Sequence, residues 1–122
     1  NAQDFPLNKK ALSTRNGVTM VRPALNDLSR ASKELGLEKT LFKNVSGEGY
    51  RTNQEQEAAY DAYLAGQGNR AAPPGSSMHE VGRAIDIDSN YLAQHPELLD
   101  WLDRAGWVNA VPEEPWHWEY QG

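Results

Sequence analysis

The amino-acid sequence predicts an α+β fold, in which helices flank a small antiparallel sheet. Helices are indicated where apolar residues recur at three- and four-residue spacing, over residues 22–35, 52–66 and 96–105. Strands are indicated by short apolar or alternating segments, at residues 41–50, 83–88, 107–111 and 116–120. The 122 residues suffice for a single domain, 1–122, with one modest core. We expect residues 1–19 to form a polar, irregular N-terminal arm on this domain.

The second helix has the clearest start. Thr52 followed by Glu55 three positions later is a capping box, which marks a helix N-terminus. Alanines together with Tyr63 and Leu64 supply an apolar face that we expect to be buried. Arg51 then lies between a strand end and this helix, where a bound anion would meet both the guanidinium and the helix dipole.

Composition excludes several classes of protein. The formal net charge of −5 and the lack of any basic run argue against nucleic acid as a partner. No apolar stretch approaches the length needed to span a membrane. Cysteine is absent, so any metal must be held by nitrogen and oxygen ligands. The sequence shows no export signal, and location has to be inferred from the chemistry.

Two of the three histidines lie close to carboxylates in the sequence. The alternation in 83–88 places Asp86 opposite the isoleucines, and that in 116–120 places His117 opposite the large aromatic residues. If these strands are neighbours, the two side chains face each other across ~5 Å. Gly82 allows the chain to fold back and bring His79 to them. A catalytic zinc takes three protein ligands, so the sequence predicts that His79, Asp86 and His117 hold one.

A glutamate before His117 is suited to acid–base work beside such an ion. A divalent metal polarises a carbonyl oxygen and lowers the pKa of water, and a nearby carboxylate can then move the proton. Glu114 is the best candidate, on a turn rich in proline, but spacing alone does not exclude the adjacent Glu113. Without a metal, Asp86 would be a strand-end carboxylate that accepts backbone hydrogen bonds, and Glu114 a solvated turn residue.

Several motifs together resemble a known family. Ser77-x-His79-x-x-Gly82-x-Ala84-x-Asp86 followed by Glu114-x-x-His117 is similar to the zinc D-Ala-D-Ala peptidases of the bacterial cell wall. This family comprises VanY-type carboxypeptidases, VanX-type dipeptidases, and related L,D-carboxypeptidases and endolysins. The resemblance covers about 50–120 and includes Gly49-Tyr50-Arg51-Thr52, Gln56, the stretch APPG at 72–75, and Glu114-Pro115-Trp116-His117-Trp118. It implies the small α+β fold that these peptidases share with Hedgehog signalling domains.

The resemblance also implies roles for individual residues. The zinc ligands would be His79, Asp86 and His117, and the base would be Glu114 rather than Glu113. Arg51 would contact the carbonyl or the terminal carboxylate of the substrate. Ser77 would hydrogen-bond that carboxylate, and Gln56 would shape the pocket around it. The alternative role of Arg51 is a surface ion pair, and that of Ser77 is to cap or bond the loop.

One position departs from the family pattern. Glu119 stands where VanY-type members often carry Arg, on the same strand face as His117, and we expect it to alter the choice of stem peptide. Asp88 is expected to be a solvated strand end rather than support for a ligand. His95 is expected to start a helix without binding metal. Most of the four tryptophans are expected to pack in the core.

The expected function is that of a zinc-dependent D-alanyl-D-alanine carboxypeptidase, which removes the C-terminal D-Ala from peptidoglycan stem peptides. Two alternatives remain open: an L,D-carboxypeptidase or endolysin-like endopeptidase, and a non-catalytic zinc-containing module that binds wall peptides. The resemblance implies a bacterial cell-envelope location, periplasmic or secreted. We expect a monomer.

Overall fold

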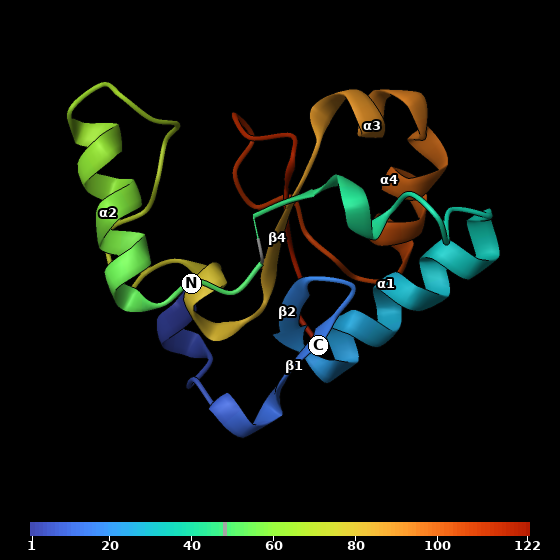
Figure 1. Cartoon of the computed structure of the whole chain (residues 1–122), viewed down its shortest axis with the longest axis horizontal. Coiled ribbons are helices and arrows are strands. Elements are labelled where there is room, and N and C mark those ends of the chain that lie inside the picture. The colour runs from blue at the N-terminus through green and yellow to red at the C-terminus, as the bar shows by residue number, and fades with distance from the viewer. Residues whose placement is uncertain (48) are drawn as a thin grey trace.

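Strand β4, Ala84–Ile87, runs through the middle of the molecule (Figure 1). The computed structural model describes residues 1–47 and 49–122. β4 lies between β3, Val45–Ser46, and β5, His117–Glu119, in an antiparallel three-stranded sheet. Its register pairs Asp86 with His117 and Ile85 with Trp118. The condition stated for Asp86 and His117 to face each other, that their strands are neighbours, is therefore met, and the α+β class is confirmed.

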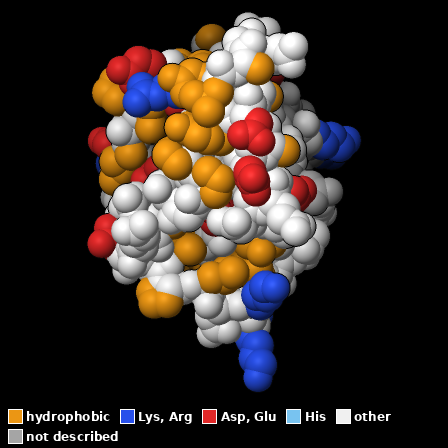
Figure 2. All heavy atoms as spheres, turned by 90° about the vertical axis from the view of Figure 1, so that its left-hand side faces the viewer, with side chains coloured by type: hydrophobic (Ala, Val, Ile, Leu, Met, Phe, Trp, Pro, Cys, Tyr) orange, Lys and Arg blue, Asp and Glu red, His pale blue; other side chains and the backbone are white. Residues whose placement is uncertain are grey.

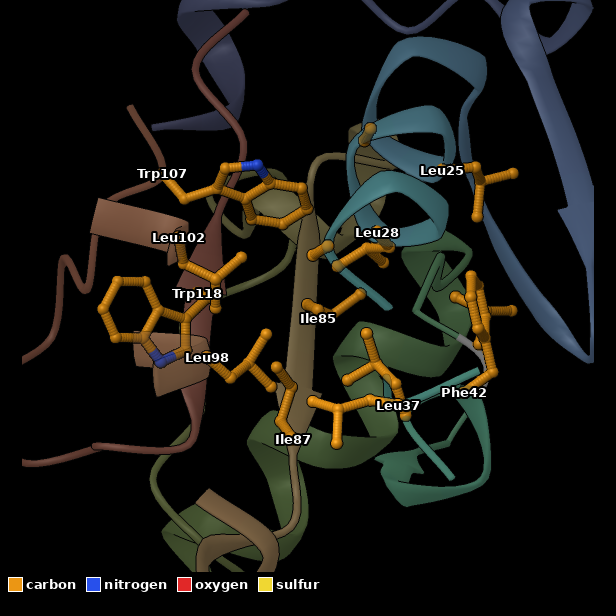
Figure 3. Close-up of a cluster of buried hydrophobic side chains, with 14 of the residues drawn as sticks. Leu25, Leu28, Leu37, Phe42, Ile85, Ile87, Leu98, Leu102, Trp107 and Trp118 are labelled. Atoms are coloured by element: carbon orange, nitrogen blue, oxygen red, sulfur yellow. The ribbon is translucent and has the colours of Figure 1, made fainter. Parts of the chain in front are cut away.

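One face of β4 carries the hydrophobic core (Figure 3). Ile85 and Ile87 are fully buried against α1, Arg22–Leu35, and α4, Pro96–Arg104. Both helices occupy the predicted ranges. In α1, buried residues such as Leu25 and Leu28 recur at helical spacing. α1 ends at Gly36, whose φ of +69° is left-handed. Asp86 points away from this core, as the alternation predicts.

The N-terminal segment differs from its prediction. In place of an irregular arm, β1, Leu12–Arg15, and β2, Val18–Val21, form an antiparallel hairpin. Two short 3₁₀ helices, η1 at Ala2–Asp4 and η2 at Lys9–Ala11, precede it. The turn is Asn16-Gly17, with φ of +52° and +82°, and such Asn-Gly pairs favour tight hairpins. The prediction was wrong because Gly17 forms a tight turn between two paired strands, whereas a glycine there was expected to prevent regular structure.

Helix α2, Asn53–Leu64, begins as predicted, since Thr52 accepts a hydrogen bond from the Glu55 amide in a full capping box. Its predicted buried apolar face is wrong. Leu64 is 64% exposed, and Gln56 is the one buried residue among those that the structure describes in this helix. Figure 1 shows α2 set apart from α1 and α4, and Figure 2 shows hydrophobic side chains gathered on the side of the molecule that α2 occupies.

Two predicted strands are largely absent among the described residues, and one helix was missed. Within 41–50, the 3₁₀ helix η3, Phe42–Asn44, precedes the two-residue β3; Glu48 of that segment lies outside the described residues. Within 107–111, Val108 forms an isolated bridge to Glu119. The additional helix is α3, Ser89–Gln94, which Asp88 caps through the Tyr91 amide. The Asp88 side chain thus starts a helix directly after β4.

Candidate metal centre

A cavity of about 490 Å³ opens on the polar side of β4. Its walls come from β4, β5, α2, the turn before β5, and the connection from α2 to η4, Met78–Val81. That connection, residues 66–77, is rich in glycine and proline and has no helix or strand along its described length. The cavity therefore joins segments that are far apart in the sequence.

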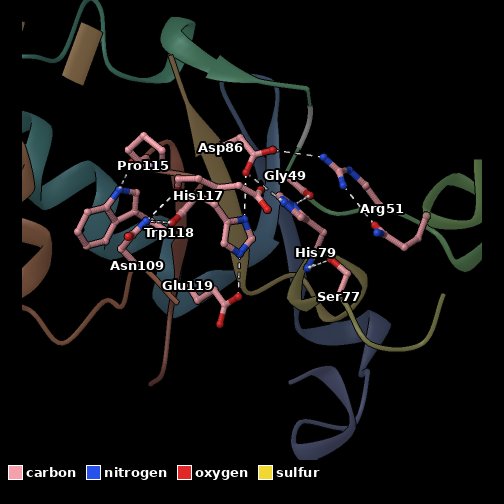
Figure 4. A network of polar contacts seen from close by, with 12 residues as sticks. Gly49, Arg51, Ser77, His79, Asp86, Asn109, Pro115, His117, Trp118 and Glu119 are labelled. Carbon is pink, nitrogen blue, oxygen red and sulfur yellow. Dashed lines mark hydrogen bonds and ion pairs between the residues drawn. The ribbon is translucent and has the colours of Figure 1, made fainter. Parts of the chain in front are cut away.

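The three predicted ligands meet at the base of this cavity (Figure 4). Oδ1 of Asp86 lies 3.3 Å from Nε2 of His79 and 3.1 Å from Nδ1 of His117. The ligand atoms of all three residues lie within 4.8 Å of one another. Both imidazoles are buried and Asp86 is half-buried. Two nitrogens and one oxygen at this spacing suit a tetrahedral zinc ion with one further position.

The outer nitrogen of each imidazole has its own oxygen partner. Nδ1 of His79 donates to the carbonyl oxygen of Gly49 at 2.8 Å, and Nε2 of His117 donates to Oε2 of Glu119 at 2.7 Å. A proton on these outer nitrogens leaves the inner nitrogens as lone-pair donors when the rings are neutral. The chemistry of this donor set therefore fits a bound zinc ion.

Strong electrostatic coupling links the three ligands. Burial opposes the charge on Asp86, but hydrogen bonds from His117 and His79 outweigh it and lower the pKa of this carboxyl group. Burial likewise opposes the charge on His117, yet hydrogen bonds to Asp86 and Glu119 raise the pKa of this imidazole to about 9. Without metal, His117 is thus an imidazolium held between two carboxylates.

The surroundings of Glu114 and Glu113 distinguish these two candidate bases. Glu114 lines the cavity beside the metal-type ligands, and burial raises the pKa of its carboxyl group. Its backbone oxygen accepts hydrogen bonds from the His117 amide at 3.0 Å and from Asn109 Nδ2 at 2.9 Å, which fix the turn. Glu113 instead forms an exposed ion pair with Arg70 at 3.2 Å. Of the two glutamates, Glu114 is therefore the one that faces the cavity.

Three other predicted site residues also line the cavity. Arg51 contacts Asp86 at 3.3 Å and donates to Oε1 of Gln56 at 3.2 Å. Gln56 also donates to the carbonyl oxygen of Ala72 at 2.9 Å, which ties α2 to the loop. Ser77 caps η4 and accepts from the His79 amide at 3.2 Å. The capping role of Ser77 is thus observed, and its hydroxyl proton stays available.

Residues expected to stand outside the site do so. His95 lies at the start of α4, 3.0 Å from Glu97, away from the three ligands. Trp107 and Trp118 are buried in the core. Trp116 instead lines the cavity.

The fold and this cluster define a class: an α+β domain with a candidate metal centre and a further carboxylate, Glu114, in the same cavity. The family model for "VanY: D-alanyl-D-alanine carboxypeptidase" matches residues 19–122, so the chain belongs to this family. A D-alanyl-D-alanine carboxypeptidase of Enterococcus faecalis is 28% identical over 131 residues, covering 84% of this chain and 47% of the relative. The chain thus spans about half the length of that curated relative.

Solved structures share the fold. VanYB in complex with D-Alanine-D-Alanine matches 97% of this chain and 79% of its own, with a TM-score of 0.61 and 24% identity. A mutant of the vancomycin resistance D,D-pentapeptidase VanY, in complex with Zn(II), matches 98% and 84%, with a TM-score of 0.56 and 24% identity. At these identities the likeness establishes the fold.

Sequence reasoning missed three contacts of the site: the Gly49 carbonyl on His79, the Asn109 side chain beneath the turn, and the Glu119 carboxylate on His117. The Gly49 and Asn109 contacts could not be predicted, because no sequence motif or periodicity links the segments that they join. Glu119 was placed on the face of His117, and its spacing of two residues along a strand could have revealed the contact.

Proposed function

We propose that the chain is a zinc-dependent D,D-carboxypeptidase that removes the C-terminal D-Ala from peptidoglycan stem peptides. One observation carries the proposal: His79, Asp86, His117 and Glu114 converge on one cavity in a chain of the VanY family. The relative in the family is named for this activity, and one structural neighbour was solved with D-Alanine-D-Alanine.

Zinc would be held by Nε2 of His79, Oδ1 of Asp86 and Nδ1 of His117, the three atoms that face one another. When bound, zinc supplies a Lewis acid that polarises a carbonyl oxygen and lowers the pKa of water. Support comes from the donor set itself and from the neighbour solved with Zn(II). The outer hydrogen bonds of His79 and His117 hold both rings ready for this role.

Glu114 would carry the proton. It accepts a proton from the attacking water, whose oxygen adds to the carbonyl carbon of the scissile peptide bond. When the C–N bond breaks, Glu114 gives that proton to the nitrogen of the leaving D-Ala. Burial raises the pKa of the Glu114 carboxyl group toward neutral pH, which suits a group that must both accept and donate a proton.

Arg51 and Ser77 would bind the substrate's anionic groups. The Arg51 guanidinium lies at the cavity wall, where Gln56 orients it and where it can stabilise negative charge on a carbonyl oxygen or carboxylate. Ser77 uses its oxygen to accept from the His79 amide, so its hydroxyl proton can be donated to a terminal carboxylate. Gln56 shapes this pocket from α2.

We further propose that the protein works outside the cytoplasm, in the bacterial cell envelope, periplasmic or secreted, and as a monomer. The cell wall is where the proposed substrate lies. Across residues 1–47 and 49–122, the structure contains no helix long and apolar enough to cross a membrane. Light scattering on the purified protein tests the oligomeric state.

The decisive experiment compares Glu114→Ala with the wild-type protein on defined tri-, tetra- and pentapeptide stems, with products read by mass. The wild type is expected to release one D-Ala from the pentapeptide. Glu114→Ala should still bind zinc and lose about 10²–10⁴-fold in rate, because general acid–base catalysis is removed.

Glu113→Ala is the matched control, since Glu113 is exposed and paired with Arg70, and its activity should be unchanged. Undiminished turnover by Glu114→Ala would disprove the role of this residue. Release from the tetrapeptide alone would indicate an L,D-carboxypeptidase. Internal cleavage would indicate an endopeptidase, and binding without any cleavage would indicate a non-catalytic module.

A further inference from the structure

The side chain of Glu119 makes the shortest contact to a predicted metal ligand. Its Oε2 lies 2.7 Å from Nε2 of His117, and only 14% of the side chain is exposed. The two residues stand two positions apart on the same face of β5. Glu119 therefore reaches the imidazole from its outer side, while Asp86 lies at the inner nitrogen, Nδ1 (Figure 4).

The backbone holds Glu119 firmly in this place. Its amide donates to the carbonyl oxygen of Val108 at 2.8 Å, and its carbonyl oxygen accepts from the Val108 amide at 2.9 Å. On the other side, Glu119 pairs with Ala84 of β4. A backbone paired on both sides keeps the Glu119 side chain on the same strand face as His117, which allows their contact of 2.7 Å.

We propose that Glu119 is a positioning residue for the metal centre: its carboxylate fixes the proton of His117 on Nε2 and thereby directs the lone pair of Nδ1 toward the metal. This inference rests on the zinc ligation that we propose above. It gives a position outside the ligand–base motif a defined task in metal binding.

The physical reason is the two-sided chemistry of imidazole. A neutral ring has one N–H and one lone pair, and the partner of the outer nitrogen decides which is which. For His79 that partner is the neutral carbonyl oxygen of Gly49, at 2.8 Å. For His117 it is the charged carboxylate of Glu119, which also makes the ring a stronger electron donor. Removal of such a partner weakens metal binding about 10–100-fold.

Direct ligation by Glu119 is a different arrangement, and the geometry argues against it. The carboxylate lies at Nε2, whereas Asp86 and His79 lie on the side of Nδ1. The two ring nitrogens point away from each other, so Glu119 would have to leave its present contact to reach the other three ligands. X-ray absorption of the zinc-loaded protein is expected to report two nitrogen ligands and one carboxylate from the protein.

The test measures zinc affinity by competition with a chromophoric chelator, without substrate. Glu119→Met keeps the length of the side chain but removes the acceptor, and should weaken zinc binding about 10–100-fold. Glu119→Gln keeps an acceptor oxygen, and should recover most of that loss. The long-range ¹H–¹⁵N spectrum of the zinc-loaded wild type should show the His117 proton on Nε2, and Glu119→Met should move that proton resonance upfield because its hydrogen bond to the carboxylate is lost.

The chain offers a matched control. Glu97 also lies two residues after a histidine and contacts its ring, at 3.0 Å from His95, but neither residue belongs to the three-ligand group or lines the cavity. Glu97→Met should leave zinc affinity unchanged. Thermal unfolding of the metal-free variants shows whether any loss of affinity is only a loss of fold. A loss of fold would explain neither the recovery of affinity in Glu119→Gln nor a spectral change at the His117 ring.

Two outcomes separate this inference from the proposed function. If the wild type binds zinc but Glu119→Met binds it equally well, the role of Glu119 is disproved and the ligand set stands. If the wild type binds no zinc at all, the proposed function itself fails. Zinc coordination by two carboxylates would overturn the positioning role in favour of direct ligation.

Discussion

At the scale of single residues, the candidate site is a closed network of charges and hydrogen bonds. His117 lies between Asp86 and Glu119, and Arg51 contacts the second oxygen of Asp86. Among the described residues, every buried side-chain nitrogen and oxygen has a hydrogen-bond partner. In the metal-free protein, a proton on Nδ1 of His117 takes the place beside Asp86 that the metal would occupy.

This arrangement predicts that zinc binding depends on pH. The pKa of His117 is raised to about 9, so at pH 7 the ring is protonated and Nδ1 must lose its proton before it can bind metal. We expect about one proton released by His117 per zinc, and an apparent affinity that rises about tenfold per pH unit below pH 9. Calorimetry in two buffers of different ionisation enthalpy measures the released protons.

His117→Ala is the control, because it removes the titrating ring and should abolish this share of the proton release. A heat of binding that is identical in both buffers at pH 7 would contradict the prediction.

At the scale of elements, β4 and its neighbours separate two functions. Ile85 and Ile87 face the core, whereas Asp86 between them faces the cavity. The β1–β2 hairpin supports His79 indirectly. The carbonyl oxygen of Thr19 in β2 accepts a hydrogen bond from the Tyr50 amide at 2.9 Å. Tyr50 follows Gly49, whose carbonyl oxygen accepts from His79. The segment that sequence analysis assigned to an irregular arm thus contributes to the site.

Gly49 is a position where this arrangement tolerates no side chain. Its φ is +82°, and a Cβ there would lie 2.8 Å from the backbone oxygen of Thr19. Gly17 has the same φ of +82°, but a Cβ there would meet nothing within 4 Å. We expect Gly17→Ala to cost about 1–2 kcal/mol in free energy of unfolding, and Gly49→Ala about 1–3 kcal/mol more through overpacking.

Urea denaturation of both variants measures this difference. Gly49→Ala should also weaken zinc binding, because the shifted carbonyl oxygen no longer orients His79, whereas Gly17→Ala should bind zinc normally. Equal stability losses in the two variants would show that the contact with Thr19 is not restrictive.

At the scale of the whole molecule, stability and substrate access are divided between two sides. The core lies between the sheet, α1 and α4, whereas α2 contributes mainly a wall of the cavity. Gln56 connects that wall to the site through Arg51 and to the loop through Ala72. Helix α2 is thus held by polar contacts near its start, and its last two residues, Tyr63 and Leu64, are exposed.

Two leucines in helices test this division. Leu28 of α1 is fully buried, and Leu28→Ala should cost about 2–5 kcal/mol in free energy of unfolding through cavity formation. Leu64 of α2 is 64% exposed, and Leu64→Ala should stay within about 0.5 kcal/mol of the wild type. Chemical denaturation measures both; a large loss for Leu64→Ala would mean that α2 packs on something in solution.

The sequence by itself determined the features that depend on local pattern. Helical spacing fixed α1 and α4, the Thr52–Glu55 box fixed the start of α2, and alternation placed Asp86 and His117 on the polar side of their strands. The ligand motif also indicated the family before any coordinates. These features depend on residues within a few positions of one another, where spacing translates directly into direction.

Only the tertiary structure decided which distant segments meet. It brought Gly49 to His79, set Glu113 apart from Glu114 through Arg70, and seated Glu119 on the outer nitrogen of His117. It also left the apolar residues of α2 exposed, although their composition suggested a buried face. Such contacts depend on how whole elements pack, and no local periodicity encodes them.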